Sequence, residues 1–361
     1  MEQQKALIAM SGGVDSSVAA YLMQRAGFDC MGATMRLCTN ELLGDAESGC
    51  CSLDDVEDAR SVAFRLGMRF AVFNAAEDFR CRVVDKFVRS YEQGLTPNPC
   101  IDCNRYLKFE NLLNKALSLG FEYIVTGHYA RIRYDREADR YLIYKAVDDT
   151  KDQTYFLSCL TQHQLAHSKF PLGELTKEQV RSIAAEQGFI NARKRDSQDI
   201  CFIPDGDYVA FMERYTGKSY PQGDFLDLSG NVVGKHQGAV SYTLGQRKGL
   251  GLAMGAPVYV CAKDMQKNTV TVGPNEALFH STLIADEWNW FPFEELTAPL
   301  RVFAKARYNQ SPQSATVYPG ENGTAKVVFD TPQRALTPGQ AVVLYDGDLV
   351  VGGGTIQTVT D

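Results

Sequence analysis

The sequence LIAMSGGVDSS occupies residues 7–17 and sets the architecture of the chain around it. Its apolar start, residues 7–10, is typical of a short strand buried in a parallel sheet. The glycine pair at 12–13 gives a turn whose backbone can approach a ligand closely. Ser16 or Ser17 is expected to cap the helix that follows. A strand, a loop of exposed N–H groups and a helix N-terminus together predict an anion site.

The centre of this stretch is SGGVDS, residues 11–16, hereafter the SGGVDS loop. It is not a Walker phosphate loop, because no Gly-Lys-Ser/Thr ending follows the glycines. It resembles the PP-loop of the ATP pyrophosphatases, which split ATP between the alpha and beta phosphates. A bare Ser-Gly-Gly turn also occurs in ordinary strand-to-helix connections. The order strand, SGGxDS, helix is more specific and favours a nucleotide site.

Length and composition indicate a globular protein of two or three domains. The chain has 361 residues, of which 45% are hydrophobic and 22% charged. The polar start at residues 1–5 leaves no room for a signal peptide, and no apolar run is long enough to cross a membrane. We therefore expect a cytoplasmic protein with no membrane partner.

Cysteine content and net charge restrict the class further. Ten cysteines without a dense framework argue against a disulfide scaffold, so most are expected to be buried thiols. The net charge of −7 argues mildly against nucleic acid, because phosphate is normally neutralised by a basic surface. Local basic clusters do occur, at 193–195, 247–248 and 301–307. An RNA partner must be argued from these clusters.

Strands and helices alternate through the first third of the chain. The expected elements are strands at 28–37, 70–73 and 123–126 and helices at 54–67, 78–91 and 104–119. This alternation predicts an α/β fold with a doubly wound parallel sheet covered on both faces. Ligands of such sheets lie at the carboxyl ends of the strands. The SGGVDS loop, Met35 and the Gly127-His128 pair should therefore share one edge.

The pattern changes farther along the chain. Residues 130–146 fit a hairpin laid on the first domain, and residues 150–160 and 176–187 look helical. After a short helix at 208–215 the chain becomes turns and alternating strands. We place domain boundaries at 1–204 for the α/β catalytic domain, 205–280 for a small mixed central domain and 281–361 for an all-β domain.

A Cys-x-x-Cys pair, Cys100 and Cys103, lies in the Pro-rich stretch TPNPCIDCN just before a predicted helix. A thiol at a helix start has a lowered pKa, because the helix dipole favours the thiolate. Cys103 is nearest that start and is the better nucleophile candidate. A thioredoxin-like redox pair or half of a zinc site are alternatives. Structural zinc is disfavoured, because Cys50 and Cys51 are adjacent rather than spaced as a second knuckle.

A third cysteine, Cys201, stands in KRDSQDICFI, residues 194–203. The cations Lys194 and Arg195 favour its thiolate. Its apolar neighbours fit a strand residue equally well. This segment alone leaves both interpretations open.

Eight segments in order resemble the bacterial tRNA-specific 2-thiouridylases, which thiolate the wobble uridine, position 34, of certain tRNAs. They read AMSGGVDSSVAA, TPNPCIDCNRYLKF, IVTGHYAR, KDQTYFL, RDSQDICFI, TLGQRKGLG, ARY and LTPGQAVVLYDGDLVVGGG and span residues 9–354. An amide-nitrogen transferring PP-loop synthetase is a weaker match, since no glutaminase-like companion is present and the cysteines stay unexplained. The family implies a C-terminal β-barrel and a central domain that helps to hold tRNA.

The resemblance also implies roles for individual residues. ATP contacts fall on Ala9, Met10, Ser11, Gly12, Gly13, Val14, Asp15, Ser16, Met35 and Gly127. Cys103 matches the catalytic nucleophile, and Cys201 matches the cysteine that carries the persulfide. Contacts to tRNA fall on Asn98, Pro99, Cys100, His128, Lys151, Asp152, Gln153, Arg307, Tyr308 and Gln340, of which the first three contact the target base.

The family's chemistry requires ATP, Mg²⁺ and a persulfide donor protein, and it joins Cys103 to Cys201 in a disulfide during turnover. We expect a monomer. One departure matters: part of the family has Asp at the position of Cys100, so a carboxylate's acid or base role is in doubt here. An iron-sulfur cluster on Cys100, Cys103 and Cys201 is the second-ranked alternative. A non-catalytic, ATP-responsive RNA-binding protein is the rival from another class.

Overall fold

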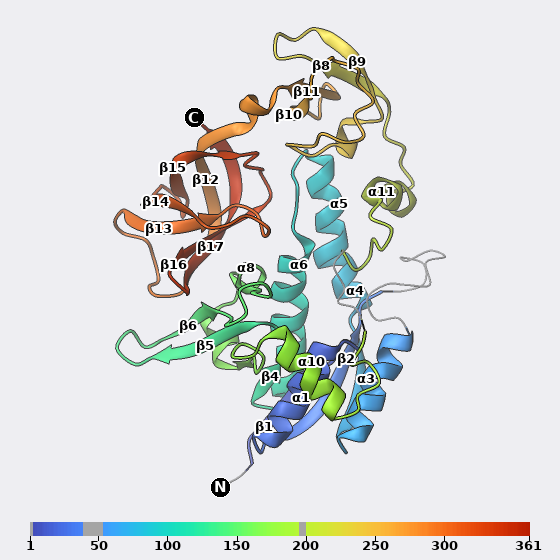
Figure 1. The fold of residues 1–361 in the computed structure, drawn as a ribbon, viewed down its shortest axis with the longest axis vertical. Helices are drawn as coiled ribbons and strands as arrows, with labels where there is room; N and C mark the ends of the chain where they lie inside the picture. The colour runs from blue at the N-terminus through green and yellow to red at the C-terminus, as the bar shows by residue number, and fades with distance from the viewer. Residues whose placement is uncertain (1–2, 39–52, 195–199) are drawn as a thin grey trace.

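The computed structural model describes residues 3–38, 53–194 and 200–361. Three β-sheets organise this part of the chain. Figure 1 shows the α/β part at one end, a β-barrel beside its upper half and a small sheet at the opposite end. No helix among the described residues is long and apolar enough to cross a membrane.

The α/β part is built on a five-stranded parallel sheet, which confirms the predicted fold class. The strands are β1 (Lys5–Ala9), β2 (Asp29–Arg36), β3 (Arg69–Asn74), β4 (Tyr123–Val125) and β7 (Ser168–Lys169), in the order β3-β2-β1-β4-β7. Strand β1 lies in the middle, with Ala6, Leu7 and Ile8 fully buried. Its loop therefore leaves the centre of the sheet edge.

Helices cover both faces of this sheet. Ile8 packs in one apolar cluster with α1 (Val14–Arg25), α3 (Leu53–Arg65) and α10 (Lys177–Glu186). Leu7 points to the other face and packs in a second cluster. That face carries two longer helices with π-helical segments. One comprises α4 (Ala76–Phe79), η1 (Arg80–Val84) and α5 (Asp85–Glu92), and the other comprises α6 (Pro99–Asp102), η2 (Cys103–Leu112) and α7 (Leu113–Ser118).

The hairpin of β5 (Ala130–Asp135) and β6 (Arg140–Lys145) extends from the α/β part and joins another sheet. Strand β6 pairs with β17 of the barrel, so the hairpin is shared between two domains. Two short helices follow, α8 (Thr154–Leu157) and α9 (Gln162–Ala166). The helix expected over 150–160 is thus a single turn.

The central part contains α11 (Tyr208–Thr216) and a four-stranded sheet with its own core. Its strands are β8 (Gly223–Leu226), β9 (Val232–His236), β10 (Tyr259–Asp264) and β11 (Thr269–Gly273), in the order β10-β11-β8-β9. Helix α11 does not belong to that core, because Phe211 and Met212 pack in the Leu7 cluster of the α/β part.

The C-terminal part is a closed β-barrel, as predicted. Its strands are β12 (Phe279–Trp290), β13 (Leu300–Lys305), β14 (Gln313–Pro319), β15 (Ala325–Arg334), β16 (Ala341–Asp346) and β17 (Leu349–Thr360). Strand β12 pairs with both β15 and β17, which closes the barrel. The boundaries 1–204, 205–280 and 281–361 stay a prediction, since α11 and the β5–β6 hairpin each pack across them.

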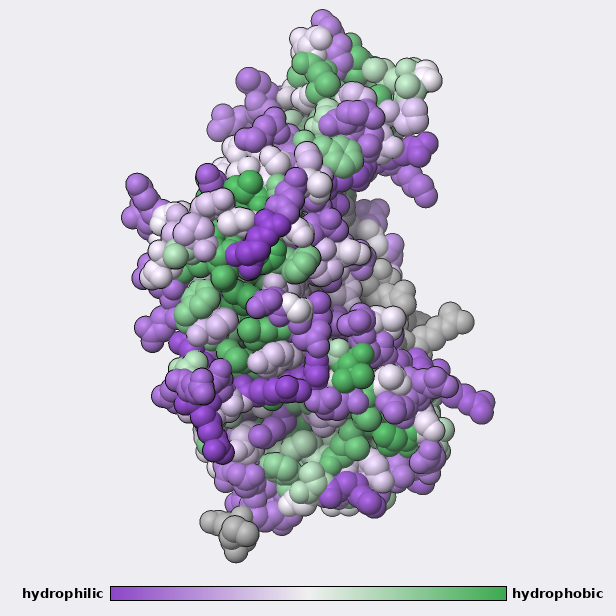
Figure 2. All heavy atoms as spheres, turned by 60° about the vertical axis from the view of Figure 1, so that its left-hand side comes forward, coloured by the Kyte–Doolittle hydropathy of each residue, from purple (hydrophilic) through white to green (hydrophobic). Residues whose placement is uncertain are grey.

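The face in Figure 2 is a mosaic of hydrophilic and hydrophobic side chains. Exposed apolar residues include Val147 at 52% and Phe303 at 47% relative exposure. Scattered apolar residues are normal on globular proteins and identify no binding face by themselves.

Candidate nucleotide and thiol site

The SGGVDS loop leaves the carboxyl end of β1, and α1 begins at Val14 with Gly13 as its N-cap. The expectation that Ser16 or Ser17 caps this helix is wrong. Both serines lie inside the first helical turns, and their hydroxyls donate to the Gly13 carbonyl at 3.0 Å. Gly13 has no side chain, so the N-cap residue accepts no hydrogen bond from the first N–H groups of α1 through a side chain. A helix start of this kind suits a phosphate.

The loop is held in place by α3 and by the segment after α10. Gly12 has φ +76°, and a Cβ there would lie 2.3 Å from the carbonyl oxygen of Asp55. Only glycine fits so close to a neighbouring backbone. Asn191, which is 3% exposed, donates its amide hydrogens to the Gly12 carbonyl and to Ser17 Oγ, both at 2.9 Å. The turn is therefore fixed from two sides.

Asp15 is bound by two residues from distant parts of the chain. Lys177 Nζ lies 2.7 and 2.8 Å from its carboxylate oxygens, and the Tyr129 hydroxyl donates to Oδ1 at 2.9 Å. Gly127 packs against the same turn, since a Cβ on it would lie 2.8 Å from Ser16 N. The end of β4 therefore meets the SGGVDS loop.

Met35 lies near the carboxyl end of β2 and is 9% exposed. The preceding Thr34 donates its hydroxyl to the Met10 carbonyl at 2.7 Å, which ties β2 to the chain leaving β1. Residues expected to contact ATP thus gather at one edge of the sheet.

The cysteine helix, residues 99–118, starts earlier than expected. Asn98 is its N-cap, with Oδ1 accepting from Cys100 N at 3.2 Å, and Pro99 is its first residue. The prediction that Cys103 lies nearest the helix start is therefore wrong, because Cys100 is second in the helix and Cys103 fifth. The helix dipole acts mainly within the first turn, so it favours a thiolate at Cys100 more than one at Cys103. Cys100 is exposed, and Cys103 is half-buried.

Cys201 is also half-buried. The neighbouring Phe202 is 2% exposed and packs edge-on against Phe79 and Phe87, with ring centroids 5.6 and 5.3 Å apart. Cys103 and Cys201 border the same apolar cluster, the one that contains Leu7. The structure thus places both thiols along one core.

The cationic neighbour expected for Cys201 is engaged elsewhere. Lys194 Nζ lies 2.7 Å from Asp55 and 2.6 Å from Asp58 on α3. Arg195, Cys50 and Cys51 lie outside the described residues. Lys194 therefore joins the Cys201 segment to the helix that borders the SGGVDS loop.

The iron-sulfur alternative finds no support in the structure. Over residues 3–38, 53–194 and 200–361, no three His, Cys, Asp or Glu side chains are grouped so that they could hold a metal ion. Cys100, Cys103 and Cys201 all lie within these ranges.

His128 follows Gly127 at the same sheet edge. Its ring packs against both Phe109 and Phe170, with centroids 5.8 and 5.9 Å away, and Nδ1 lies 2.7 Å from Thr126 Oγ1. Burial, assisted by the charge of Lys108, holds the pKa of His128 well below its usual value. The imidazole is therefore neutral near pH 7.

Several residues expected to contact tRNA are engaged in contacts within the protein. Asp152 is buried and accepts hydrogen bonds from Ala146 N at 3.2 Å and Thr154 Oγ1 at 2.7 Å, and burial raises the pKa of its carboxyl. Gln153 exchanges hydrogen bonds with the backbone of Tyr129. Lys151 lies just before them, partly buried.

Three others join the barrel to the rest of the molecule. The Tyr308 hydroxyl donates to the Asp152 carbonyl at 3.3 Å. Arg307 donates to the carbonyls of Leu244 and Ala335, at 3.2 and 2.7 Å. The side-chain amide of Gln340 donates to the carbonyls of Thr96 and Pro97, just ahead of the cysteine helix. These residues hold the domains together, whatever they do for tRNA.

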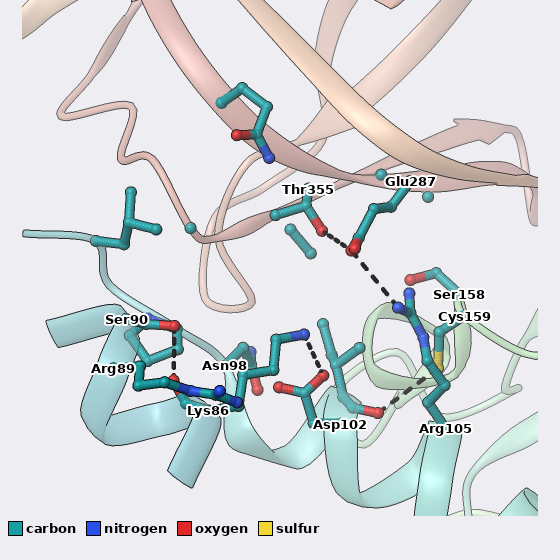
Figure 3. A pocket seen from close by; sticks show the side chains of 18 of the residues that line it. Lys86, Arg89, Ser90, Asn98, Asp102, Arg105, Ser158, Cys159, Glu287 and Thr355 are labelled. Atoms are coloured by element: carbon teal, nitrogen blue, oxygen red, sulfur yellow. Dashed lines mark hydrogen bonds and ion pairs between the residues drawn. The ribbon is translucent and has the colours of Figure 1, made fainter. Parts of the chain in front are cut away.

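A pocket of about 430 Å³ lies between α5, the cysteine helix and barrel strands β12 and β17 (Figure 3). Asn98, Asp102 and Arg105 line it, whereas Cys100 and Cys103 do not. Asp102 is 5% exposed and pairs with Lys86 at 2.8 Å, and Arg105 lies 3.5 Å from Glu287 of the barrel. The pocket therefore occupies the side of the helix away from Cys100 and Cys103.

Sequence reasoning missed Lys177, Tyr129 and Asn191, which hold the SGGVDS loop. Tyr129 follows Gly127-His128 directly, and this adjacency was a usable signal. Lys177 and Asn191 come from the far end of the domain, and nothing in their local sequence links them to residues 11–16.

Models of known families match each of the three parts of the chain. Family models match residues 4–205 as tRNA methyl transferase HUP domain, 209–274 as tRNA methyl transferase PRC-barrel domain and 280–356 as aminomethyltransferase beta-barrel domain. A solved 4-thiouridine synthetase–RNA complex with bound ATP is 16% identical over 58% of this chain and 50% of its own, at a TM-score of 0.35.

Full-length relatives are far more similar. The tRNA-specific 2-thiouridylase MnmA of Acetivibrio thermocellus is 51% identical over 99% of this chain and 100% of its own. Those of Clostridium acetobutylicum and Clostridioides difficile are 50% and 48% identical, each over 98% of this chain and 99% and 98% of their own. The chain belongs to the family of tRNA-specific 2-thiouridylases.

Proposed function

We propose that this protein uses ATP to replace the 2-oxygen of the wobble uridine of tRNA by sulfur. The observation that carries the proposal is that the SGGVDS loop, a helix start suited to phosphate, follows the strand whose Leu7 lies in the apolar cluster that Cys103 and Cys201 border. The similarity to the 2-thiouridylases along the whole chain supports it.

The first step activates the base. The 2-carbonyl oxygen of uracil is a poor leaving group, so it first attacks the alpha phosphorus of ATP, and pyrophosphate leaves. The SGGVDS loop and the start of α1 would hold the phosphates through N–H groups, and Mg²⁺ would offset their charge. ATP contacts are assigned to residues 9–16, Met35 and Gly127.

The second step delivers sulfur. Cys201 carries a persulfide supplied by a donor protein. Either Cys103 attacks this persulfide and releases sulfide, or the persulfide attacks C2 of the base directly. In the first route the released sulfide attacks C2 and AMP leaves. In the second, AMP leaves as the C2–S bond forms, and Cys103 then attacks Cys201 Sγ, which breaks the S–S bond and frees the thiolated base. Both routes end with a Cys103–Cys201 disulfide, which a thiol reductant must return to two thiols.

The target base must leave the anticodon stack to reach these thiols. We assign residues 98–100 to the base, and His128, residues 151–153, Arg307 and Tyr308 to the rest of the tRNA. The tRNA contact predicted for Gln340 is not carried forward, because its amide nitrogen already donates to the carbonyls of Thr96 and Pro97. We propose a monomer that acts in the cytoplasm.

A direct assay tests the proposal. Purified protein is incubated with unmodified tRNA, ATP, Mg²⁺ and a persulfide donor, and 2-thiouridine is measured by nucleoside mass spectrometry together with pyrophosphate. We expect both products in equal amounts. Cys103→Ser and Cys201→Ser should each lower the rate by at least a hundredfold.

The matched control is Cys261→Ser, because Cys261 is half-buried in the central sheet, away from both thiols in sequence and element. It should retain normal activity. Normal activity in Cys201→Ser would refute the sulfur-carrier role. Binding of tRNA and ATP without pyrophosphate release would instead favour the rival, a non-catalytic RNA-binding protein.

A further inference from the structure

The four residues ahead of the cysteine helix, 95–98, form a short link, hereafter the cysteine link, which is held from the barrel. Thr96 N donates to the Pro338 carbonyl at 3.0 Å. The side-chain amide of Gln340 donates to the carbonyls of Thr96 at 2.8 Å and Pro97 at 3.3 Å. Three hydrogen bonds thus join this link to residues 337–340, hereafter the barrel turn.

The barrel turn is itself rigid. Gln340 N donates to the Thr337 carbonyl at 3.2 Å, and the backbones of Gly339 and Gln340 bond Ile356 of β17 at 2.8 and 2.9 Å. Gly339 has φ +88°, and a Cβ there would lie 2.9 Å from both Leu95 Cβ and Thr96 N. The close approach of turn and link therefore requires glycine at 339.

The cysteine link has few anchors of its own. Leu95 N donates to the Ser90 carbonyl at 2.9 Å, and Pro97 has no N–H to donate. Beyond Leu95 the link therefore depends on Thr96 N and on the carbonyls that Gln340 binds. Asn98, directly after Pro97, caps the helix through Cys100 N. Any shift of the Thr96 and Pro97 carbonyls is passed to this cap, and through it to the first turn of the helix.

We propose that Gln340 is a positioning residue for the thiol site: its amide fixes the cysteine link, and the link sets the place of the helix turn that carries Cys100 and Cys103. This inference rests on the proposed function. It differs from a direct tRNA contact, because the amide nitrogen of Gln340 already donates to two protein carbonyls. The barrel thereby takes part in the reaction without touching the base.

The test compares Gln340→Ala with Gln313→Ala. Gln313 is a matched control, because it too is a partly buried barrel glutamine whose amide donates to a backbone carbonyl, that of Ser311 at 3.2 Å. We expect Gln340→Ala to lower the single-turnover rate of 2-thiouridine formation at saturating tRNA by tenfold or more, since small misplacements of reacting groups have effects of this order. The Kd for tRNA should change less than threefold. Gln313→Ala should match the wild type.

A second measurement does not depend on turnover. Alkylation of Cys103 by iodoacetamide, followed by peptide mass spectrometry, should be at least threefold faster in Gln340→Ala, because a loosened helix start exposes this half-buried thiol. Gly339→Ala should show the same two effects by pushing turn and link apart. Melting temperatures of all variants verify that they are folded.

The outcomes separate the two hypotheses. Weaker tRNA binding with an unchanged saturating rate would make Gln340 a direct tRNA contact and overturn the inference. An unchanged rate together with unchanged alkylation would also overturn it. Absence of 2-thiouridine from the wild type would refute the proposed function alone, and the alkylation rates would still decide whether Gln340 positions the helix.

Discussion

Asp15 shows how one residue of the SGGVDS loop depends on the rest of the domain. Its carboxylate accepts from Lys177 on α10 and from Tyr129 after β4. These bonds fix the first turn of α1 and occupy the oxygen atoms that would otherwise repel an incoming phosphate. A negative side chain beside an anion site is tolerable because a buried cation, only 9% exposed, is paired with it.

At the same scale, His128 should make stability depend on pH. Burial holds its folded-state pKa well below the unfolded value of about 6.5. The contribution of the neutral ring is therefore fully present above about pH 6.5 and is lost as the pH falls from there towards the folded-state pKa. The slope from this single group is at most about 1.4 kcal/mol per pH unit.

The variant His128→Asn isolates this effect. Its free energy of unfolding in urea, measured from pH 8 to pH 5, should lie below that of the wild type by a constant amount above pH 7. The gap should narrow below about pH 6.5, because only the wild type then protonates on unfolding. Other titrating groups are common to both proteins and cancel. A gap that stays constant down to pH 5 would contradict a neutral His128 in the folded protein.

At the scale of elements, the two glycines of the SGGVDS loop should respond differently to substitution. Gly12 has φ +76° and lies against the backbone of α3, whereas among the described residues a Cβ on Gly13 would meet Ser11 Oγ alone, at 3.4 Å. Gly12→Ala must displace α3 or the loop and should cost about 2 to 4 kcal/mol of unfolding free energy. Gly13→Ala should cost about 1 kcal/mol or less. Urea unfolding monitored by circular dichroism measures both, and equal losses would show that α3 does not constrain the turn.

Much of the element pattern was predictable from the sequence, since strands such as Lys5–Ala9 are short apolar runs between turn residues. The start of the cysteine helix was misplaced although Asn98-Pro99 is a typical N-cap and first-residue pair. The restriction of the helix expected over 150–160 to the single turn α8 was not predictable. The buried Asp152 accepts from Ala146 and Thr154, so the residues ahead of α8 are held by tertiary contacts and do not join the helix. Periodicity carries no information on such tertiary contacts.

The candidate site was predictable only as a set of motifs. The SGGVDS loop and Gly127 could be placed together, because parallel strands end at one edge. The contacts of Lys177 and Gln340 could not, since each joins segments more than 150 residues apart. The motifs identify the reacting groups, and the fold alone identifies what holds them.

At the scale of the whole molecule, the α/β part and the barrel share one core. Phe291, Val343 and Tyr345 of the barrel belong to the same apolar cluster as Leu7 and Phe87. Polar contacts reinforce the junction. Arg140 of the hairpin donates to the Phe291 carbonyl at 2.6 Å, and the buried Tyr155 hydroxyl donates to the Ala341 carbonyl at 2.9 Å. Separating the two parts would expose this surface to water.

We therefore expect the α/β part and the barrel to unfold together. The two tryptophans of the chain, Trp288 and Trp290, both lie in β12, so their fluorescence reports on the barrel. The longer helices lie in the α/β part, so far-UV circular dichroism reports on that part. The two signals should give the same midpoint in urea, which is the test for a cooperative unit.

The variant Tyr155→Phe sharpens this test, because it removes one hydrogen bond across the shared core and leaves the ring in place. It should lower the unfolding free energy by about 1 kcal/mol, and both urea midpoints should fall together. Tyr318→Phe is a suitable control, since Tyr318 of β14 is 37% exposed on the barrel surface, and it should leave both signals unchanged. A fluorescence transition that moves without the circular dichroism transition would show that the barrel unfolds on its own. In that case the barrel turn could not hold the cysteine link in place under conditions where the barrel is open.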